Sequence, residues 1–281
     1  MRCVMLIENT SATQKLSVEH GFSFYIEHSD GAYLFGTGAD GKLVSNAKKL
    51  HLALKNVKAA VIPHNHFAVS GGIEALLNTN PDMLFFAKQA CALTPEIKKI
   101  AGYSALGNIG KYIRRYKNSF VLFKSFQQIG ENFFLMSCEE TSEQTLPDKS
   151  VIRLENGEII KDSFEHECFG VVFPDKDRKS GCVVISACSH SGIENIIKTV
   201  QKTWEGVKIN SLICGLHFMG SNPNRLGCAQ EQVEKTAEFI KKSNIGSVYV
   251  CHCTGVKGYS VMKNILGEKI HYLQTGGEIY F

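Results

Sequence analysis

The sequence contains no apolar run of the roughly 18 residues that a membrane-spanning helix needs, so it does not predict an integral membrane protein. The opening MRCVMLIENT has too short an apolar stretch for a signal peptide and predicts a first strand. The 10 cysteines include no Cys-x-x-Cys pair. In a chain of this length without a signal peptide, that pattern favours reduced thiols in a cytoplasmic protein over a disulfide framework.

The sequence also lacks a large excess of positive or negative charge. The 31 basic and 27 acidic residues give a net charge of +4 that is spread along the chain, so no nucleic-acid partner is expected. Neither a P-loop nor a Ser-His-Asp order is present. The hydrophobic content of 44% is ordinary for a globular protein with a sizeable core. We expect a single domain over residues 1–281 that binds a small-molecule substrate or ligand, and the oligomeric state stays open.

The predicted elements alternate between strands and helices after a β-rich opening. Strands are expected at 2–8, 22–29, 32–38 and 57–63, with a hairpin at Asp30-Gly31 and helices at 43–54 and 71–77. From Gly181 on, strands at 182–188, 209–216, 247–251 and 270–276 alternate with helices at 193–204, 230–242 and 259–267. This alternation predicts a layered α/β protein. The irregular middle, about 80–160, is interpreted as an insertion or a lid over a site.

Five of the 10 histidines follow the C-terminal ends of predicted strands. Loops at one edge of a sheet can converge, so these side chains are expected to meet in space. The alternative interpretation is that each histidine caps a strand or satisfies a buried backbone group. The five are His64 and His66 after VKAAVIP, His190 after CVVISAC, His217 after INSLICG and His252 after SVYVC.

His64, His66 and His190 form the best candidate triad for a metal ion. Two imidazoles on one tight loop set a bite angle, and a third comes from a distant strand. Imidazole suits zinc and iron, and three ligands leave a tetrahedral position open for water. A metal there lowers the pKa of that water towards about 7 and supplies hydroxide at neutral pH.

The order of several segments resembles the metallo-β-lactamase superfamily. Within it, the chain is similar to the metal-dependent hydrolases that are related to dihydropterin-ribofuranosylaminobenzene-phosphate synthase. The resemblance runs from about Leu16 to the C-terminus and implies a four-layer αββα sandwich with the metal centre at one edge of its two sheets. The segments that carry it are EHGFSFYIE, LFGTG, NAKKL, IPHNHFAVSGGI, SACSHSGIENII, CGLHF and VCHCTG.

The resemblance also implies a two-metal signature, His-x-His-x-Asp-His-x-Gly-Gly, of which this chain keeps only part. In HNHFAVSGG, the two histidines and both glycines, Gly71 and Gly72, match. Ala68 stands in the position of the Asp, and Val69 stands in the position of the last His. In LFGTG, Gly36 stands where the family has an Asp that braces the ligands.

The first metal site therefore keeps its three imidazoles, and the second keeps His252, the histidine of HCTG. Cys251 and Cys253 flank that histidine, but on a strand they would point to the opposite face, so thiolate ligands are not expected there. His217 and His20 are candidate substrate contacts, His20 because EHGFS matches a family segment near the site.

We therefore expect a metal-dependent hydrolase with one ion, zinc or else iron, in a reduced centre. The alternative is a metal-free pseudoenzyme that keeps the fold for ligand binding or interaction. The two hypotheses differ in whether purified protein holds a metal that depends on His64.

Overall fold

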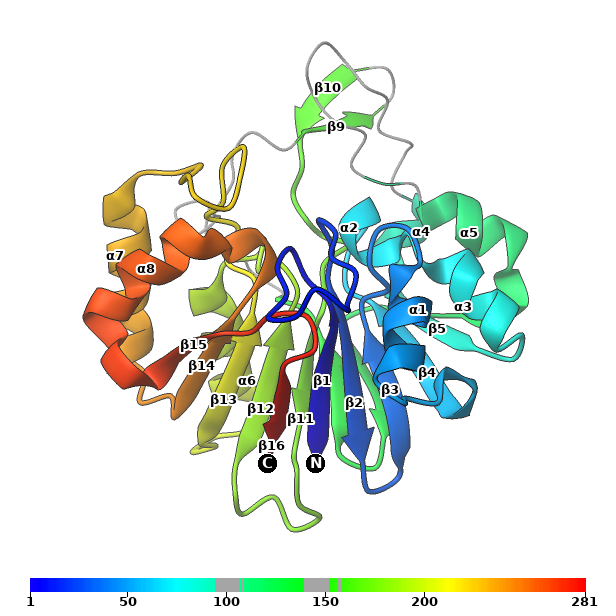
Figure 1. The fold of residues 1–281 in the computed structure, drawn as a ribbon, viewed down its shortest axis with the longest axis horizontal. Coiled ribbons are helices and arrows are strands. Elements are labelled where there is room, and N and C mark those ends of the chain that lie inside the picture. Colours follow the sequence, from blue (N-terminus) through cyan, green and yellow to red (C-terminus); the bar gives the residue numbers. More distant parts are fainter. Residues whose placement is uncertain (94–106, 108, 139–151, 156–157) are drawn as a thin grey trace. The chain divides into compact units, whose positions relative to one another are not determined.

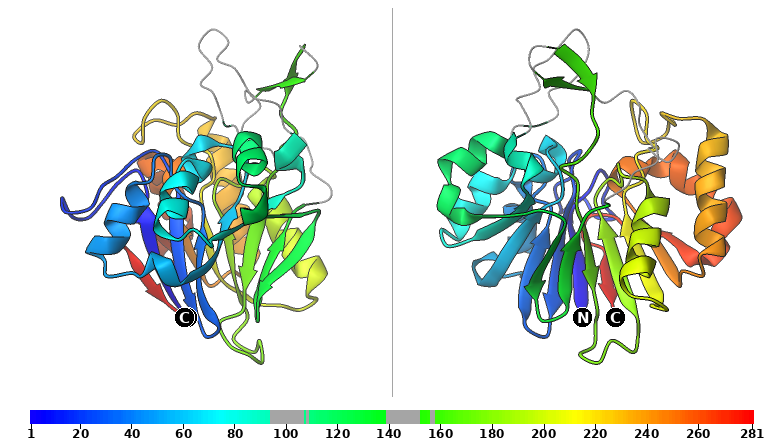
Figure 2. Two further views of the ribbon diagram at one scale, coloured as in Figure 1. Left: turned by 90° about the vertical axis from the view of Figure 1, so that its right-hand side faces the viewer. Right: turned by 180° about the vertical axis from the view of Figure 1, so that it is seen from behind.

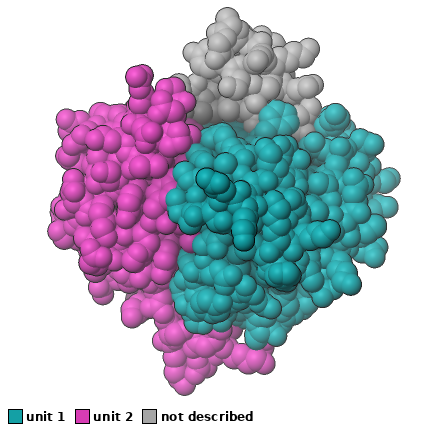
Figure 3. Space-filling view, in the orientation of Figure 1, with its two compact units in different colours: residues 1–124, 149–168, 274–281 teal, residues 125–148, 169–273 magenta. Residues whose placement is uncertain are grey.

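The computed structural model describes residues 1–93, 107, 109–138, 152–155 and 158–281. The chain forms two compact units, which Figure 3 shows in different colours. Unit 1 consists of Met1–Lys124, Lys149–Cys168 and Gln274–Phe281, and unit 2 consists of Ser125–Asp148 and Phe169–Leu273.

Unit 1 is built on a seven-stranded mixed sheet with the order β16-β1-β2-β3-β4-β5-β6. The strands from β16 to β3 pair antiparallel, and those from β3 to β6 pair parallel. The strands are β1 (Arg2–Ile7), β2 (Ser23–His28), β3 (Gly31–Phe35), β4 (Val57–Ile62), β5 (Leu84–Lys88), β6 (Phe120–Phe123) and β16 (Glu278–Tyr280). A separate hairpin of β9 (Ile152–Glu155) and β10 (Glu158–Lys161) belongs to the same unit.

The helices of unit 1 pack against one face of this sheet (Figures 1 and 2). They are α1 (Lys42–Lys49), α2 (Phe67–Ser70), α3 (Ile73–Thr79), α4 (Ala90–Leu93) and α5 (Ile109–Arg115). Alternate strand residues such as Ala60 and Ile62 share a buried core with helix residues such as Leu43 and Leu76. Successive side chains of a strand point to opposite faces, so this spacing gives the sheet one face for the helices.

Unit 2 repeats the plan with the order β15-β14-β13-β12-β11-β8-β7. Here β12 to β15 pair parallel, and β7, β8, β11 and β12 pair antiparallel. Its strands are β7 (Phe126–Gly130), β8 (Phe133–Met136), β11 (Phe169–Val172), β12 (Cys182–Ser186), β13 (Ile209–Cys214), β14 (Ser247–Val250) and β15 (Ile270–Tyr272). Its helices are α6 (Ile193–Thr203), α7 (Gln230–Lys242) and α8 (Gly255–Leu266).

Helix α6 shows why the periodicity of the sequence predicts these helices. Ile193, Ile196, Ile197 and Val200 recur at helical spacing, and all four are buried in the core of unit 2. Helices α6, α7 and α8 pack against the same face of the sheet. Each unit by itself is a layer of helices on a sheet, which is one half of the αββα sandwich that the sequence predicts.

Two local predictions have different outcomes. The hairpin at Asp30-Gly31 is confirmed, since β2 and β3 pair through His28 and Gly31 around a tight turn. The helix predicted over 43–54 is too long, because α1 ends at Lys49. His51 adopts a left-handed backbone with φ 58° and stops the helix.

The lid predicted over about 80–160 lies partly outside the described residues. Its described part includes α5 and the β9–β10 hairpin. Across the described ranges, no helix is both long and apolar enough to cross a membrane.

The glycine pair of HNHFAVSGG marks a close approach between two loops of unit 1. A Cβ atom on Gly71 would lie 1.7 Å from the backbone oxygen of Ala39, and one on Gly72 would lie 2.2 Å from that of Thr37. The backbone N–H of Gly71 donates to the oxygen of Gly38 at 2.9 Å. The loop after β3 and the segment after β4 are therefore held together at positions that have no room for a side chain.

We expect Gly71→Ala to destabilise unit 1 by about 3 kcal/mol, because its Cβ meets backbone that cannot rotate away. Urea denaturation followed by circular dichroism measures this. Gly110→Ala is the matched control: its Cβ would meet the flexible end of Arg114 at 3.3 Å and two backbone oxygens at ordinary contact distances of 3.6 and 3.7 Å, and alanine favours helix α5. Equal midpoints for the two variants would contradict the close approach.

Candidate metal centre

His64 and His66 lie together in unit 1, directly after β4. Their ring centroids are 4.6 Å apart with the planes at 88°, and both side chains are buried. His66 precedes α2, and the Ser70 hydroxyl donates to its backbone oxygen at 2.8 Å. The two imidazoles are therefore held by the turn between a parallel strand and a short helix, as the sequence predicts.

His166 holds the loop of His64 and His66 through a hydrogen bond to the loop backbone. The sequence does not predict this role. The backbone N–H of Asn65, the residue between the two histidines, donates to His166 Nδ1 at 3.2 Å. Because Nδ1 accepts, the ring proton lies on Nε2, which donates to Asp162 Oδ2 at 3.0 Å. A second branch runs from the Ile109 N–H to Asn65 Oδ1 at 2.8 Å. The loop conformation thus depends on groups 101 and 44 residues away in the chain.

The carboxylate of Asp162 is stabilised by its partners. Burial raises its pKa, but the hydrogen bond from His166 and that from the backbone N–H of Phe164 outweigh burial, so the pKa lies below its ordinary value. Ligand atoms of His66, Asp162 and His166 all lie within 4.8 Å of one another. His166 uses both ring nitrogens in hydrogen bonds, which favours a positioning role for it over a direct ligand role.

In unit 2, the loops after the parallel strands β12, β13 and β14 carry His190, His217 and His252. The rings of His190 and His217 have centroids 4.6 Å apart. His190 and His252 are almost fully buried, and His217 is partly buried. The prediction that histidines at these strand ends meet in space is confirmed for His190 and His217.

The expectation that Cys253 points away from His252 is wrong. Strand β14 ends at Val250, and His252 lies in a 3-10 turn with a left-handed φ of 47°. Strand alternation therefore no longer applies at this point. Ligand atoms of Cys188, His252 and Cys253 lie within 4.8 Å of one another.

The cysteines of the chain fall into two chemical groups, and none of the 10 forms a disulfide. Burial raises the pKa of Cys91 and of Cys182 to about 12, as expected for small buried hydrophobes. At Cys253, burial also raises the pKa, but hydrogen bonds from Cys188 and His217 outweigh it and lower the pKa below the ordinary value. The environment of Cys253 thus favours the thiolate.

The predicted triad draws on both units, since His64 and His66 belong to unit 1 and His190 to unit 2. It therefore stays a prediction, as does His252 as an additional ligand. His20 is exposed, in the segment before β2, and its contact with a substrate also stays a prediction.

Ala68, Val69 and Gly36 stand at the three positions where the resemblance implies polar residues of a second metal site. Ala68 and Val69 lie in α2, and Val69 is fully buried. Gly36 has a φ of +76°, and a Cβ on it would lie 2.4 Å from the backbone oxygen of Phe22. A side chain in this position needs the backbone to move.

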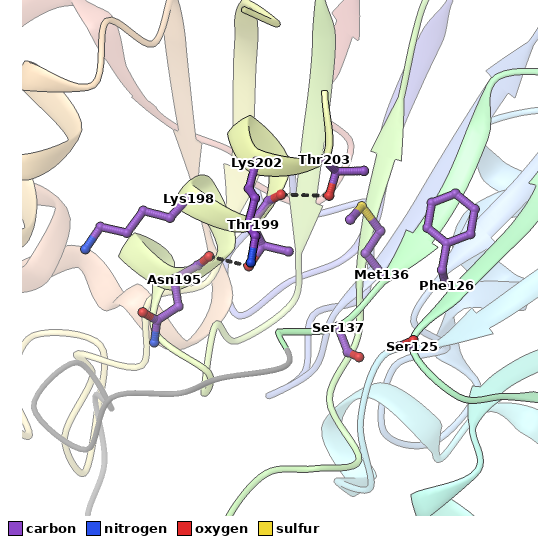
Figure 4. A pocket seen from close by; sticks show the side chains of 9 residues that line it. All are labelled: Ser125, Phe126, Met136, Ser137, Asn195, Lys198, Thr199, Lys202 and Thr203. Carbon is purple, nitrogen blue, oxygen red and sulfur yellow. Dashed lines mark hydrogen bonds between the residues drawn. The ribbon is translucent and has the colours of Figure 1, made fainter. Parts of the chain in front are cut away.

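A cavity of about 460 Å³ lies elsewhere in unit 2 (Figure 4). It is lined by α6 and by strand residues such as Phe126 and Met136, and none of the predicted site residues lines it. The hydroxyl groups of Thr199 and Thr203 donate to helix oxygens one turn back, at 2.7 and 2.8 Å. Both hydroxyl groups therefore donate hydrogen bonds within helix α6.

Comparison with known proteins gives two curated relatives that span nearly the whole chain. The first is 7,8-dihydropterin-6-methyl-4-(β-D-ribofuranosyl)-aminobenzene-5′-phosphate synthase of Methanocaldococcus jannaschii, 26% identical over 278 residues, which cover 94% of this chain and 90% of that protein. An uncharacterised protein of the same organism is 23% identical over 261 residues, 93% of each chain. No family model matches the sequence.

Solved structures show the fold. Tm1679, a metal-dependent hydrolase of the β-lactamase superfamily, superposes with a TM-score of 0.81 at 25% identity, covering 100% of this chain and 99% of that one. The metallo-β-lactamase fold protein YhfI of Bacillus subtilis gives 0.59 at 10% identity, with 99% of each chain covered. The short form of human tRNase Z gives 0.51 at 11% identity and covers 100% of this chain and 99% of that one. The predicted fold class is confirmed.

We expect Asp162→Asn to destabilise unit 1 by about 1–3 kcal/mol, because one amide oxygen cannot accept from both His166 and the Phe164 N–H. Asp82→Asn, at an exposed position, is the control, and urea denaturation measures both. Because the pKa of Asp162 is lowered by folding, its contribution is complete above about pH 4 and is lost as the pH falls below that range. A difference that persists unchanged in acid would contradict the contribution of the Asp162 carboxylate.

Proposed function

We propose that this chain, which shares the metallo-β-lactamase fold, is a metal-dependent hydrolase of that superfamily whose centre holds a single ion between His64, His66 and His190. His252 is an additional candidate ligand, and His217 and His20 are candidate substrate contacts. The observation that carries the proposal is the buried pair of imidazoles after β4, with ring centroids 4.6 Å apart. Tm1679, which shares the fold across its whole length, is itself described as a metal-dependent hydrolase.

The donor set suits zinc first and iron second, since neutral imidazole is a ligand for both. A bound ion of either kind would supply Lewis acidity and lower the pKa of a water at its open position. The chain's own contribution is to fix the donors. The N–H of Asn65 is anchored on His166, which orients the loop between the two histidines, and Asp162 fixes the tautomer of His166.

Ala68, Val69 and Gly36 support a centre that has lost its second family site. Neither Ala68 nor Val69 offers a metal ligand, and Gly36 offers no carboxylate to brace one. A single zinc ion with three protein ligands is sufficient for hydrolytic chemistry in other enzymes. We propose a small-molecule substrate. The reaction named for the M. jannaschii relative is not transferred to this chain, because its metal centre is altered.

The same three residues favour the alternative, a pseudoenzyme that keeps the fold and binds a ligand without a metal. Both hypotheses agree on the fold and on the burial of His64. They differ in whether the imidazoles of His64, His66 and His190 bind a metal ion.

We expect untagged protein purified without chelator to lose about one equivalent of zinc or iron on His64→Ala, because three imidazoles are the minimum for firm binding. Elemental analysis by mass spectrometry measures this. His271→Ala is the control, since that histidine is exposed on β15 and stacks on Tyr249.

A metal content that is substoichiometric and unchanged by His64→Ala would reject the hydrolase and leave the metal-free alternative. Loss of metal from the His271→Ala protein as well would show that the bound metal is nonspecific.

A further inference from the structure

Unit 2 contains a cluster of an imidazole, that of the additional candidate ligand His252, and two thiols that the proposed hydrolytic centre does not use. Cys188 follows β12, and His252 and Cys253 follow β14. All three side chains are buried, with exposed fractions of 3%, 1% and 3%. One ligand atom from each lies within 4.8 Å of the others. We propose that this cluster, with its two thiolates, binds a thiophilic divalent cation such as zinc.

The spacing suits this chemistry. In a tetrahedral zinc site with thiolate and imidazole ligands, the donor atoms lie roughly 3.6–3.8 Å apart, given Zn–S of about 2.3 Å and Zn–N of about 2.0 Å. Atoms already within 4.8 Å reach that separation by small side-chain rotations. Two thiolates and one imidazole leave the fourth position for solvent or another donor.

The surrounding backbone holds Cys253 in place. The N–H of His217 donates to Cys253 Sγ at 3.2 Å, and hydrogen bonds of this kind orient sulfur ligands and tune them. The Met219 N–H donates to the Cys253 oxygen at 2.8 Å. Gly215 leaves room for the sulfur, because a Cβ on it would lie 2.6 Å from Cys253 Sγ.

Backbone strain is concentrated around the same cluster. Ser189, His217 and His252 are three of the seven non-glycine residues with positive φ in the described part of the chain. Each such residue costs about 1–2 kcal/mol, and such strain persists where the surrounding structure enforces it, often at ligand sites. The strained turn at His252 is what brings Cys253 to the side of Cys188.

The site goes beyond the proposed function and does not depend on it. Its ligands come from unit 2 alone, and none is a residue of the proposed His64, His66 and His190 triad. Thiolates select softer ions than carboxylates do, so this site prefers zinc or cobalt over magnesium or calcium. An ion here would join the loops after β12 and β14.

Cobalt(II) added anaerobically to reduced, metal-free full-length protein tests the site. We expect a thiolate-to-cobalt charge-transfer band in the near ultraviolet together with the intense visible bands of tetrahedral cobalt. Cys188→Ser and Cys253→Ser should each abolish the charge-transfer band or weaken cobalt affinity at least about 100-fold. Cys251→Ser, a buried neighbour outside the cluster, should keep it.

His64→Ala separates this site from the hydrolytic centre: the charge-transfer band should survive that change even if the proposed function fails. Alkylation of the native protein covers the case in which a serine variant does not fold. Zinc should protect Cys188 and Cys253 from iodoacetamide, as mapped by peptide mass spectrometry, and a chelator should remove the protection.

Three results would overturn the site. The first is the absence of a charge-transfer band in the reduced native protein. The second is a band that survives both serine substitutions. The third is a disulfide between Cys188 and Cys253 that forms readily in air and leaves zinc without effect on their alkylation.

Discussion

Parallel strand pairing is the constraint on which the candidate centre depends. In unit 2, β12, β13 and β14 pair parallel and in sequence, so the loops at their C-terminal ends must leave the sheet at the same edge. Those loops carry His190, His217 and His252 together with Cys188 and Cys253. In unit 1, β4 lies between two parallel neighbours and ends just before His64. In each unit, the candidate ligand residues therefore lie at the edge of the sheet where its parallel strands end.

This dependence explains how much could be predicted from the sequence. The positions of the strands and helices follow from apolar runs and helical spacing, as in α6, and the placement of histidines follows from the strands. A layered α/β protein follows from the same order of elements, and the αββα sandwich follows from the family resemblance. What the sequence could not supply is the exact end of each element: α1 stops at Lys49 because His51 turns left-handed, and β14 stops at Val250 just before the turn that redirects Cys253.

The hydrogen bond that holds the loop of His64 and His66 could not be predicted from the sequence, for a different reason. Asn65 and His166 are separated by 101 positions, and their hydrogen bond involves a backbone N–H that any residue but proline carries. The spacing of Asp162 and His166, four residues apart in DSFEH, is the only local signal for the pair. A positioning residue of this type is recognised from its contacts in the structure, whereas a candidate metal ligand can be recognised from its residue type in the sequence.

Gly36, which stands where the resemblance implies a bracing Asp, has a backbone conformation that does not suit a side chain. Its φ of +76° is one that an L residue rarely adopts, and the backbone oxygen of Phe22 occupies the space of a Cβ. The N–H of Gly38 donates to that same oxygen at 3.0 Å, so the loop is fixed in this conformation. An aspartate at position 36 would therefore have to break a hydrogen bond before it could brace any ligand. Restoring Ala68 and Val69 to ligands would still leave that constraint in place. The proposed thiolate cluster of unit 2 does not share this constraint, because its donors come from the loops after β12 and β14.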